Sequence, residues 1–264
     1  MRSIVITGST RGIGYGIADS FLERGCSVTI SGRNEERVAI ASESLSKKHD
    51  MERIRGVACD VRDPDQVRLL WHEAATKFGK IDIWINNAGM SGPQTEVWEY
   101  SPTQVRDVVE TNLIGLIFAS QVAVKSMLQQ GHGSIYNMEG MGSDGRMHEG
   151  LVLYGMTKYG VNYFTRGLVN ETKGSSIIVG SIRPGMILTD MIKEQYLDRP
   201  EEWARAKRIF SIIASKVEEV APWIVDRVLQ NKNSGVCISY MSRGKFLLRM
   251  LSSPFRRREL FDNP

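Results

Sequence analysis

A tyrosine and a lysine four residues apart, Tyr154 and Lys158, are the side chains of this sequence best suited to acid–base chemistry. Residues with this spacing share one face of a helix. A free phenol, with a pKa of roughly 10, is poorly poised at neutral pH, but a neighbouring ammonium group favours the phenolate and lowers that pKa. The pair therefore predicts a tyrosine tuned for proton transfer. Taken alone, the same spacing also fits an ordinary pair on a solvated helix.

A glycine-rich loop near the N-terminus predicts a phosphate site. It has the form TGxxxGxG and runs Thr7-Gly8-Ser9-Thr10-Arg11-Gly12-Ile13-Gly14. Glycines let the backbone turn tightly and approach a pyrophosphate, which then sits on the N-terminus of the following helix. The loop follows an apolar strand and opens a helix, and this context favours nucleotide binding over a simple turn.

The elements that must position these groups alternate between short β-branched runs and longer helical periods. Such alternation predicts βαβ units and a parallel sheet covered on both faces. We therefore predict one α/β domain, a Rossmann-type doubly wound parallel sheet of about seven strands. This domain spans 1–241, with a substrate-covering helical insert at about 188–217, and 242–264 form a basic and apolar tail. The predicted strands are Ser3–Thr7, Ser27–Ser31, Ile54–Cys59, Ile81–Asn86, Gly133–Met138, Ser176–Ile182 and Val236–Tyr240. The predicted helices are Ile13–Arg24, Glu35–Lys48, Pro64–Phe78, Pro102–Gln130 and Leu153–Thr172.

The end of the second strand bears on the choice of nucleotide. An NAD enzyme usually places an acid there to hold the ribose 2′-hydroxyl. The segment Ser31-Gly32-Arg33-Asn34 has no acid. Arg33, and Arg11 in the glycine loop, could instead pair with a 2′-phosphate, which suits the planar, permanently charged guanidinium group. We predict NADP(H) over NAD; the alternative is that both side chains are solvated surface arginines.

Further motifs follow in order along the chain. Asn86-Asn87-Ala88-Gly89 ends the fourth strand, Asn112 lies in the long helix, and Tyr154 and Lys158 match YxxxK. Pro184-Gly185-Met186-Ile187 ends the sixth strand, with Thr189 just beyond. Together with the TGxxxGxG loop, this ordered set resembles the short-chain dehydrogenase/reductase family over about Ser3 to Tyr240. The resemblance implies hydride transfer from a nicotinamide cofactor to a carbonyl carbon, with Tyr154 protonating the carbonyl oxygen.

The resemblance also implies roles for other residues. Lys158 would hold the nicotinamide ribose, and Asn112 would help join the lysine to bulk water in a proton relay, unless its side chain only bonds locally. Asp60 and Val61 would flank the adenine. The remaining expected cofactor contacts are Gly8, Ser9, Thr10, Arg11, Gly12, Ile13, Gly14, Arg33, Asn87, Ala88, Gly89, Pro184, Gly185, Ile187 and Thr189, with Asn87 to Gly89 at the adenosine ribose.

The serine of this family is displaced here. The family's fifth strand ends in Ser-Ser, and the usual position, thirteen before the tyrosine, falls on Met141. Ser143, eleven before Tyr154, is the nearest hydroxyl that could donate a hydrogen bond to the substrate oxygen. The alternative is that Ser143 only caps or turns the glycine-rich loop around it.

Two segments suggest a substrate class. Asn137 to Gly145 and Pro184 to Asp190 resemble the chlorophyll b reductase branch of the family, whose members reduce the ring formyl group to a hydroxymethyl group. A host without the pigment would need another aldehyde or ketone. Seven of the twelve methionines lie in or beside the motifs, which suggests a roomy apolar pocket, although core filling explains each one singly. They are Met90, Met138, Met141, Met147, Met156, Met186 and Met191.

Composition narrows the remaining classes. The net charge of +4 is small and the basic residues are scattered, so nucleic acid is not an expected partner. The three cysteines are far apart and fit a reducing compartment, and the four histidines lack metal-ligand spacing, so no metal site is predicted. The N-terminal apolar run is too short for a signal peptide, and no stretch approaches the roughly 20 apolar residues of a membrane helix. We therefore expect a soluble, cytoplasmic protein.

Several alternatives stay open. The chain could be a non-catalytic NADP(H) sensor, or a dehydrogenase of a small alcohol or 3-oxoacyl substrate; a pure scaffold has little support because the nucleotide motifs are intact. The tail could fold over the substrate pocket or lie weakly on a membrane surface. We favour a closing segment at a subunit interface, and we expect a homodimer or homotetramer.

Overall fold

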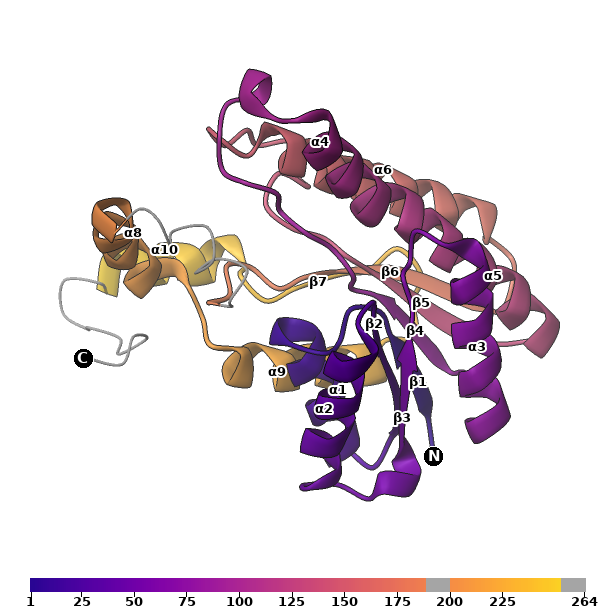
Figure 1. Cartoon of the computed structure of the whole chain (residues 1–264). Helices are drawn as coiled ribbons and strands as arrows, with labels where there is room; N and C mark the ends of the chain where they lie inside the picture. Colours follow the sequence, from indigo (N-terminus) through magenta and orange to yellow (C-terminus); the bar gives the residue numbers. More distant parts are fainter. Residues whose placement is uncertain (189–199, 253–264) are drawn as a thin grey trace.

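A seven-stranded, fully parallel sheet forms the centre of the molecule (Figure 1). The computed structural model describes residues 1–188 and 200–252. The strand order is β3-β2-β1-β4-β5-β6-β7, so the chain reverses its direction of winding between β1 and β4. This confirms the predicted doubly wound α/β fold. The strands are β1 (Ser3–Ile6), β2 (Ser27–Gly32), β3 (Ile54–Ala58), β4 (Ile83–Asn86), β5 (Gly133–Met138), β6 (Ile177–Arg183) and β7 (Cys237–Ser239).

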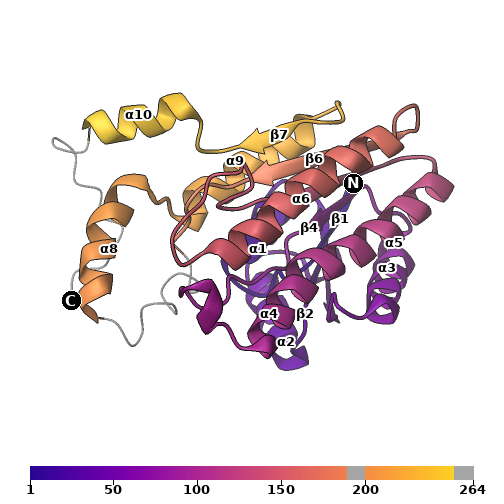
Figure 2. The same ribbon diagram turned by 90° about the horizontal axis from the view of Figure 1, so that it is seen from above.

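Helices cover both faces of the sheet (Figures 1 and 2). On one face lie α1 (Gly12–Glu23), α2 (Glu35–Ser46) and α9 (Val217–Gln230). On the other lie α3 (Pro64–Phe78), α5 (Gly115–Gln130) and α6 (Val152–Glu171). Strand β1 shows why the sequence folds this way. All four of its residues are buried; Ile4 and Ile6 pack into one core and Val5 into the other, because successive side chains of a strand point to opposite faces.

The predicted helix over Pro102–Gln130 is present but irregular. It consists of α4 (Pro102–Val109), a π-helical segment (Glu110–Ile114) and α5. By length and composition alone, this 29-residue stretch could also cross a membrane, contrary to our expectation that no stretch would. A core helix passes the same test, and Ala119, Ala123 and Met127 of α5 are buried against the sheet.

Two helices, one in the segment after β6 and one after β7, lie beyond the edge of the sheet (Figure 1). Helix α8 (Pro200–Ile213) lies within the predicted insert, and α10 (Arg243–Ser252) within the predicted tail. The chain returns from α8 through a bridge between Ile187 and Ser215. The guanidinium group of Arg249 donates to the carbonyl oxygens of Ile213 and Ala214, so α10 is fastened to the end of α8. The predicted domain boundaries remain predictions.

Candidate active site

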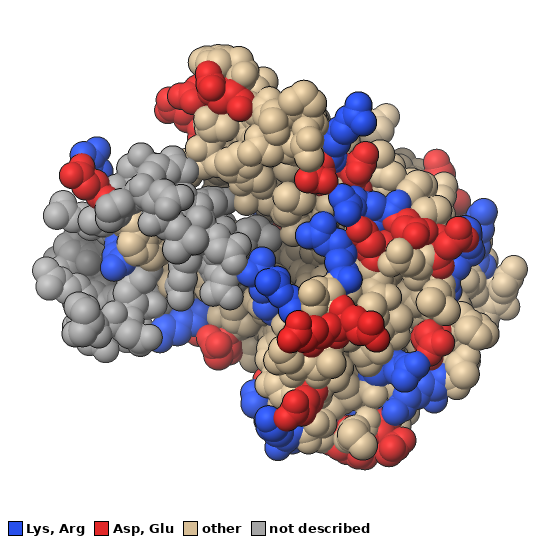
Figure 3. Space-filling model, in the orientation of Figure 1, with Lys and Arg blue, Asp and Glu red and all other residues tan. Residues whose placement is uncertain are grey.

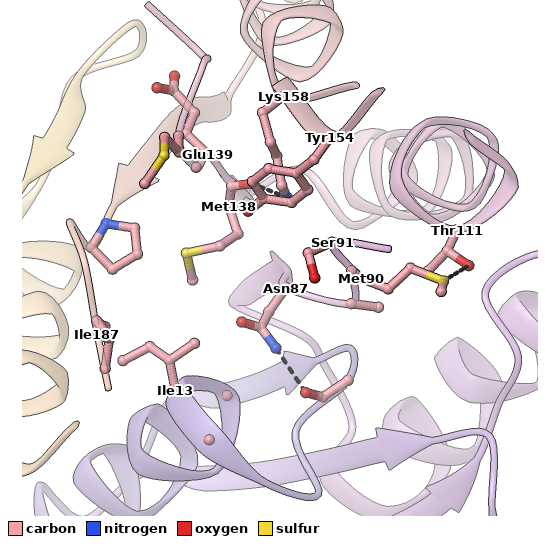
Figure 4. Close-up of a pocket in the computed structure, with 18 of the residues that line it drawn as sticks. Ile13, Asn87, Met90, Ser91, Thr111, Met138, Glu139, Tyr154, Lys158 and Ile187 are labelled. Atoms are coloured by element: carbon pink, nitrogen blue, oxygen red, sulfur yellow. Dashed lines mark hydrogen bonds between the residues drawn. The ribbon is translucent and has the colours of Figure 1, made fainter. Parts of the chain in front are cut away.

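A cavity of about 860 Å³ opens where the carboxyl ends of the strands meet. Its walls come from the loops after β1, β2, β3, β4, β5 and β6, together with α6 and Phe210 of α8. Ile13 lies on one side of it, and Lys158 and Tyr154 lie on the opposite side (Figure 4). In the space-filling view, Lys and Arg alternate with Asp and Glu over the visible face, with no broad basic stripe on the part described there (Figure 3). Ligands of open parallel sheets bind at this position, outside the carboxyl ends of the strands.

The glycine loop packs directly on the loop after β4. Gly8 has a φ of +61°, and a Cβ there would lie 2.7 Å from the Cα of Ala88. The Asn87 amide nitrogen donates to the carbonyl oxygens of Thr7 (2.9 Å) and Gly8 (2.8 Å). The Thr7 hydroxyl oxygen accepts the backbone N–H groups of Asn87 and Ala88 at 3.0 Å. These hydrogen bonds hold two predicted cofactor-binding segments, the glycine loop and the loop after β4, against each other.

Most of the predicted cofactor residues line the cavity. Ser9 does not: its buried hydroxyl donates to the carbonyl oxygen of Ile6 (2.6 Å) and accepts the N–H of Ser31 (2.9 Å), so it fastens the glycine loop to β2. Thr189 lies outside the described residues. The lining residues among those predicted are Gly8, Thr10, Arg11, Gly12, Ile13, Gly14, Arg33, Val61, Asn87, Ala88, Gly89, Pro184, Gly185 and Ile187.

Asp60 also differs from its expected position beside the adenine. It is not a lining residue, and its carboxylate accepts hydrogen bonds from the Arg62 side chain, the shortest at 2.7 Å. The Arg62 guanidinium also pairs with Asp107 at 3.0 Å. Burial raises the pKa of Asp60, but the hydrogen bonds and charge of Arg62 outweigh it and hold that pKa below its usual value. Its side chain therefore ties β3 to α4, and only Val61 faces the cavity.

Three arginines line the cavity: Arg11 of the glycine loop, and Arg33 and Arg37 in the segment after β2. Arg11 and Arg33 are exposed and line the cavity, as expected, and Arg37 lines it as well. Arg37 was missed, although it lies only four residues after Arg33. Asn34 positions it by capping α2, where its side-chain oxygen accepts the Arg37 N–H at 2.8 Å. Among the described residues, those at the end of β2 and the start of α2 that line the cavity include no aspartate or glutamate.

Tyr154 and Lys158 share the inner face of α6 and line the cavity. The Lys158 Nζ lies 5.7 Å from the centroid of the tyrosine ring and donates to the Met138 carbonyl oxygen at 3.1 Å. Burial raises the pKa of Tyr154 to about 12. Burial also lowers the pKa of Lys158 to about 8, against the opposing charge of Glu139.

The expectation that the lysine lowers the tyrosine pKa is therefore wrong for the protein alone. The ammonium group lies beside the ring and bonds to a backbone carbonyl, so it does not compensate for the desolvation of the hydroxyl. The site instead holds Tyr154 as a neutral phenol, which is the form that can donate a proton.

The turn after β5 carries Ser143 into the cavity wall. Its N–H donates to the carbonyl oxygen of Gly140 at 3.1 Å, and its side chain is buried. Gly142 has a φ of +90°, and a Cβ there would lie 2.6 Å from the Cα of Gly155. The turn therefore rests on α6 next to Tyr154. Ser143 both belongs to a turn and lines the cavity, so its catalytic role stays a prediction.

Asn112 lies in the π-helical segment, a rare geometry that occurs often at functional sites. Its side-chain oxygen accepts the Met90 N–H at 2.8 Å, and its nitrogen donates to the carbonyl oxygen of Met90 (2.8 Å) and to the Thr157 hydroxyl (3.0 Å). The side chain therefore joins the loop after β4 to α6, beside Lys158, and does not line the cavity. Its relay role stays a prediction.

The methionines are only partly gathered around the site. Met90, Met138, Met141 and Met186 line the cavity. Met147 and Met156 do not line it and are 92% and 53% exposed, and Met191 lies outside the described residues. The wall is therefore partly apolar, but polar groups of the loop after β5 share its outer part. These are Asp144, Arg146, His148 and Glu149.

The fold and the cavity together define an oxidoreductase that binds a nicotinamide dinucleotide. A family model described as short chain dehydrogenase matches residues 2–200, and the chain belongs to that family. A solved actinorhodin polyketide ketoreductase with NADPH superposes with a TM-score of 0.78 and 26% identity, covering 90% of this chain and 95% of that one.

Two curated relatives are chlorophyll(ide) b reductases. The chain is 34% identical to the probable chlorophyll(ide) b reductase NYC1 of Arabidopsis thaliana over 99% of its own length and 55% of that protein. It is 35% identical to chlorophyll(ide) b reductase NOL of Oryza sativa subsp. japonica over 86% of its length and 66% of that protein. The chain thus spans about half to two thirds of these relatives. This confirms the predicted resemblance to that branch.

The predicted cytoplasmic location is wrong by the same comparison. Four chlorophyll(ide) b reductases that match this chain are chloroplastic. The prediction rested on the start of the sequence, where no leader was seen, and the start of a chain does not decide location.

Proposed function

We propose that this protein is an NADPH-dependent carbonyl reductase that reduces the formyl group of chlorophyll b or of a similar bulky, apolar aldehyde. The observation that carries the proposal is that Tyr154 and Lys158 lie in the wall of the same cavity as the glycine loop. A neutral phenol beside a bound carbonyl can donate a proton, whereas a nucleotide sensor has no need of one.

The three arginines support NADP(H) over NAD. A 2′-phosphate would meet the guanidinium groups of Arg11, Arg33 and Arg37, which all line the cavity. The glycine loop and Asn87 would hold the pyrophosphate and the adenosine ribose. When bound, the reduced nicotinamide supplies the hydride. A lower KM for NADPH than for NADH is the expected result; a preference for NADH would refute this part of the proposal.

The residues of the chain would then act in a defined order. Lys158 holds the nicotinamide ribose, Ser143 donates a hydrogen bond to the carbonyl oxygen of the substrate, and Tyr154 transfers its proton to that oxygen as the carbon is reduced. The product is an alcohol. Ser143 and Lys158 are buried and Tyr154 is partly buried, which limits competition from water.

The substrate proposal comes from the relatives and from the cavity. The reductases described above act on chlorophyll(ide) b by name. The methionines at the wall suit a flat apolar ligand. The direct test is incubation with chlorophyllide b and NADPH, followed by pigment chromatography. A hydroxymethyl product is expected; its absence would remove the pigment as substrate.

A panel of aldehydes, ketones and 3-oxoacyl compounds tests the alternatives in the same assay. Oxidation of NADPH with any of them supports the reductase class, whereas tight NADPH binding without turnover would favour the sensor. We also expect a homodimer or homotetramer, which light scattering measures. Weak membrane contact through α10 and the residues after it would appear as co-sedimentation with vesicles.

A further inference from the structure

A buried carboxylate, Glu139, lies at the end of β5 and has no role in the chemistry described above. Its side chain is only 1% exposed. One carboxylate oxygen accepts a hydrogen bond from the Asn162 amide at 3.0 Å, and the other accepts two from the Arg183 guanidinium, at 2.9 and 2.5 Å. Its backbone N–H donates to the carbonyl oxygen of Ile182 at 2.8 Å. An isolated buried charge is costly. The hydrogen bonds from Asn162 and Arg183 compensate that cost and fix the position of the carboxylate.

Glu139 is connected to the catalytic pair through α6. Lys158 and Asn162 are four residues apart on this helix and so share a face. Lys158 bonds to the carbonyl oxygen of Met138, and Asn162 bonds to the carboxylate of the next residue. Two consecutive residues of the β5 end therefore hold two successive turns of α6. Figure 4 shows Glu139, Met138, Lys158 and Tyr154 on the same side of the cavity.

The charged groups closest to Glu139 are mostly cations. Lys158 from α6 and Arg183 from β6 are cations, and Tyr154 is a neutral phenol. Cys237 from β7 is also electrostatically coupled to Glu139, and burial raises the pKa of its thiol. Burial lowers the pKa of Lys158, and the carboxylate of Glu139 opposes that effect. Glu139 is thus coupled to one cation on α6 and one on β6, and Asp144 is a second carboxylate coupled to Arg183.

We propose that Glu139 is a positioning residue of this site: anchored by Asn162 and Arg183, its carboxylate keeps the Lys158 ammonium charged and bonded to the end of β5. This in turn fixes the face of α6 that presents Tyr154 to the cavity. The effect of Glu139 on catalysis rests on the proposed function. Its effect on the titration of Lys158 can be measured without turnover.

The first test is a lysine titration. The Lys158 side chain is followed by ¹³C NMR in lysine-labelled protein, with its signal assigned by its loss in Lys158→Arg. In Glu139→Gln, the pKa of Lys158 should fall by about one unit, the usual size for loss of a nearby opposite charge. Glu171→Gln, at the exposed end of the same helix, should leave it unchanged. A Lys158 titration in Glu139→Gln that matches wild type overturns the proposal.

A second comparison keeps the proposal testable if Glu139→Gln alone does not fold. Glu139→Gln leaves Arg183 without its partner, so Glu139→Gln/Arg183→Gln is compared with Arg183→Gln alone. Lys158 should titrate lower in the double variant than in the single one; identical titrations overturn the proposal.

The second test is the pH profile of carbonyl reduction. The alkaline limb of kcat/KM should move to lower pH in Glu139→Gln, by the same amount as the lysine titration, and Glu139→Asp should restore it in part. A loss that is equal at every pH would mean a purely structural role and would overturn the proposal. If wild type reduces no carbonyl compound while the lysine titration still shifts, the proposed function fails and the placement of Glu139 stands.

Discussion

The Tyr154 hydroxyl occupies the space that a side chain at Gly140 would fill. Gly140→Ala should therefore disable the site without disturbing the contacts between the glycine loop and Asn87. A Cβ at this position would lie 2.4 Å from the tyrosine oxygen and 3.2 Å from the Cγ of Lys158. Carbon and oxygen atoms ordinarily approach to about 3.3–3.6 Å. The hydroxyl, or the turn that carries Gly140, must therefore move by about 1 Å. A displacement of that size at a reacting group can cost about 100-fold in rate, or about 2.7 kcal/mol of barrier.

The assay is kcat/KM for aldehyde reduction, with NADPH affinity measured separately by fluorescence. We expect kcat/KM to fall on the order of 100-fold in Gly140→Ala and the NADPH affinity to stay near wild type, because the glycine loop lies across the cavity. Gly167→Ala is the matched control. It lies on the same helix as Tyr154, and a Cβ there meets nothing within 4 Å. It should keep wild-type activity and gain about 0.5–1 kcal/mol of stability. Wild-type kcat/KM in Gly140→Ala, or an equal loss in Gly167→Ala, would refute the reasoning.

Three further predictions concern single side chains. Ser143→Ala should lower kcat about 100-fold through loss of a hydrogen-bond donor to the reacting oxygen; an unchanged kcat would place that donor elsewhere. Arg33→Ala should raise the KM for NADPH about 10-fold or more and leave the KM for NADH unchanged, since a charge-assisted hydrogen bond contributes about 1.5–3 kcal/mol. The pKa of Lys158, about 8 when folded, is below its ordinary value of 10.5, so the unfolded chain binds more protons between these pH values. The free energy of unfolding should thus rise from pH 8 to pH 10 by more in wild type than in Lys158→Met, as measured by urea denaturation. Parallel pH profiles would contradict the buried lysine.

The sequence predicted the scaffold well because its signals are local and periodic. Alternating β-branched strands and helical periods determine a parallel sheet, and the predicted helix over Pro64–Phe78 has the same bounds as α3. The glycine loop and the Tyr154–Lys158 spacing also lie within single elements, so their positions at the carboxyl edge of the sheet followed from the fold.

Contacts between segments that are distant in sequence could not be predicted from the sequence. Glu139 meets Arg183 only because β5 and β6 pair in a register that bonds Glu139 to Ile182. The direction of the Tyr154 pKa depends on burial, which spacing does not reveal. The hydrogen bonds of Asn112 to Met90 and Thr157 likewise join segments that are distant in sequence.

The most direct test is a transfer experiment with NADPH in which both hydrogens at the reactive carbon of the nicotinamide are replaced by deuterium. Wild-type protein is incubated with chlorophyllide b and with a panel of simpler aldehydes, and the alcohol products are examined by mass spectrometry. We expect one deuterium on the new alcohol carbon with wild type, and a rate about 100- to 10,000-fold lower with Tyr154→Phe. No labelled alcohol from any carbonyl compound, or the wild-type rate with Tyr154→Phe, would contradict the proposed function.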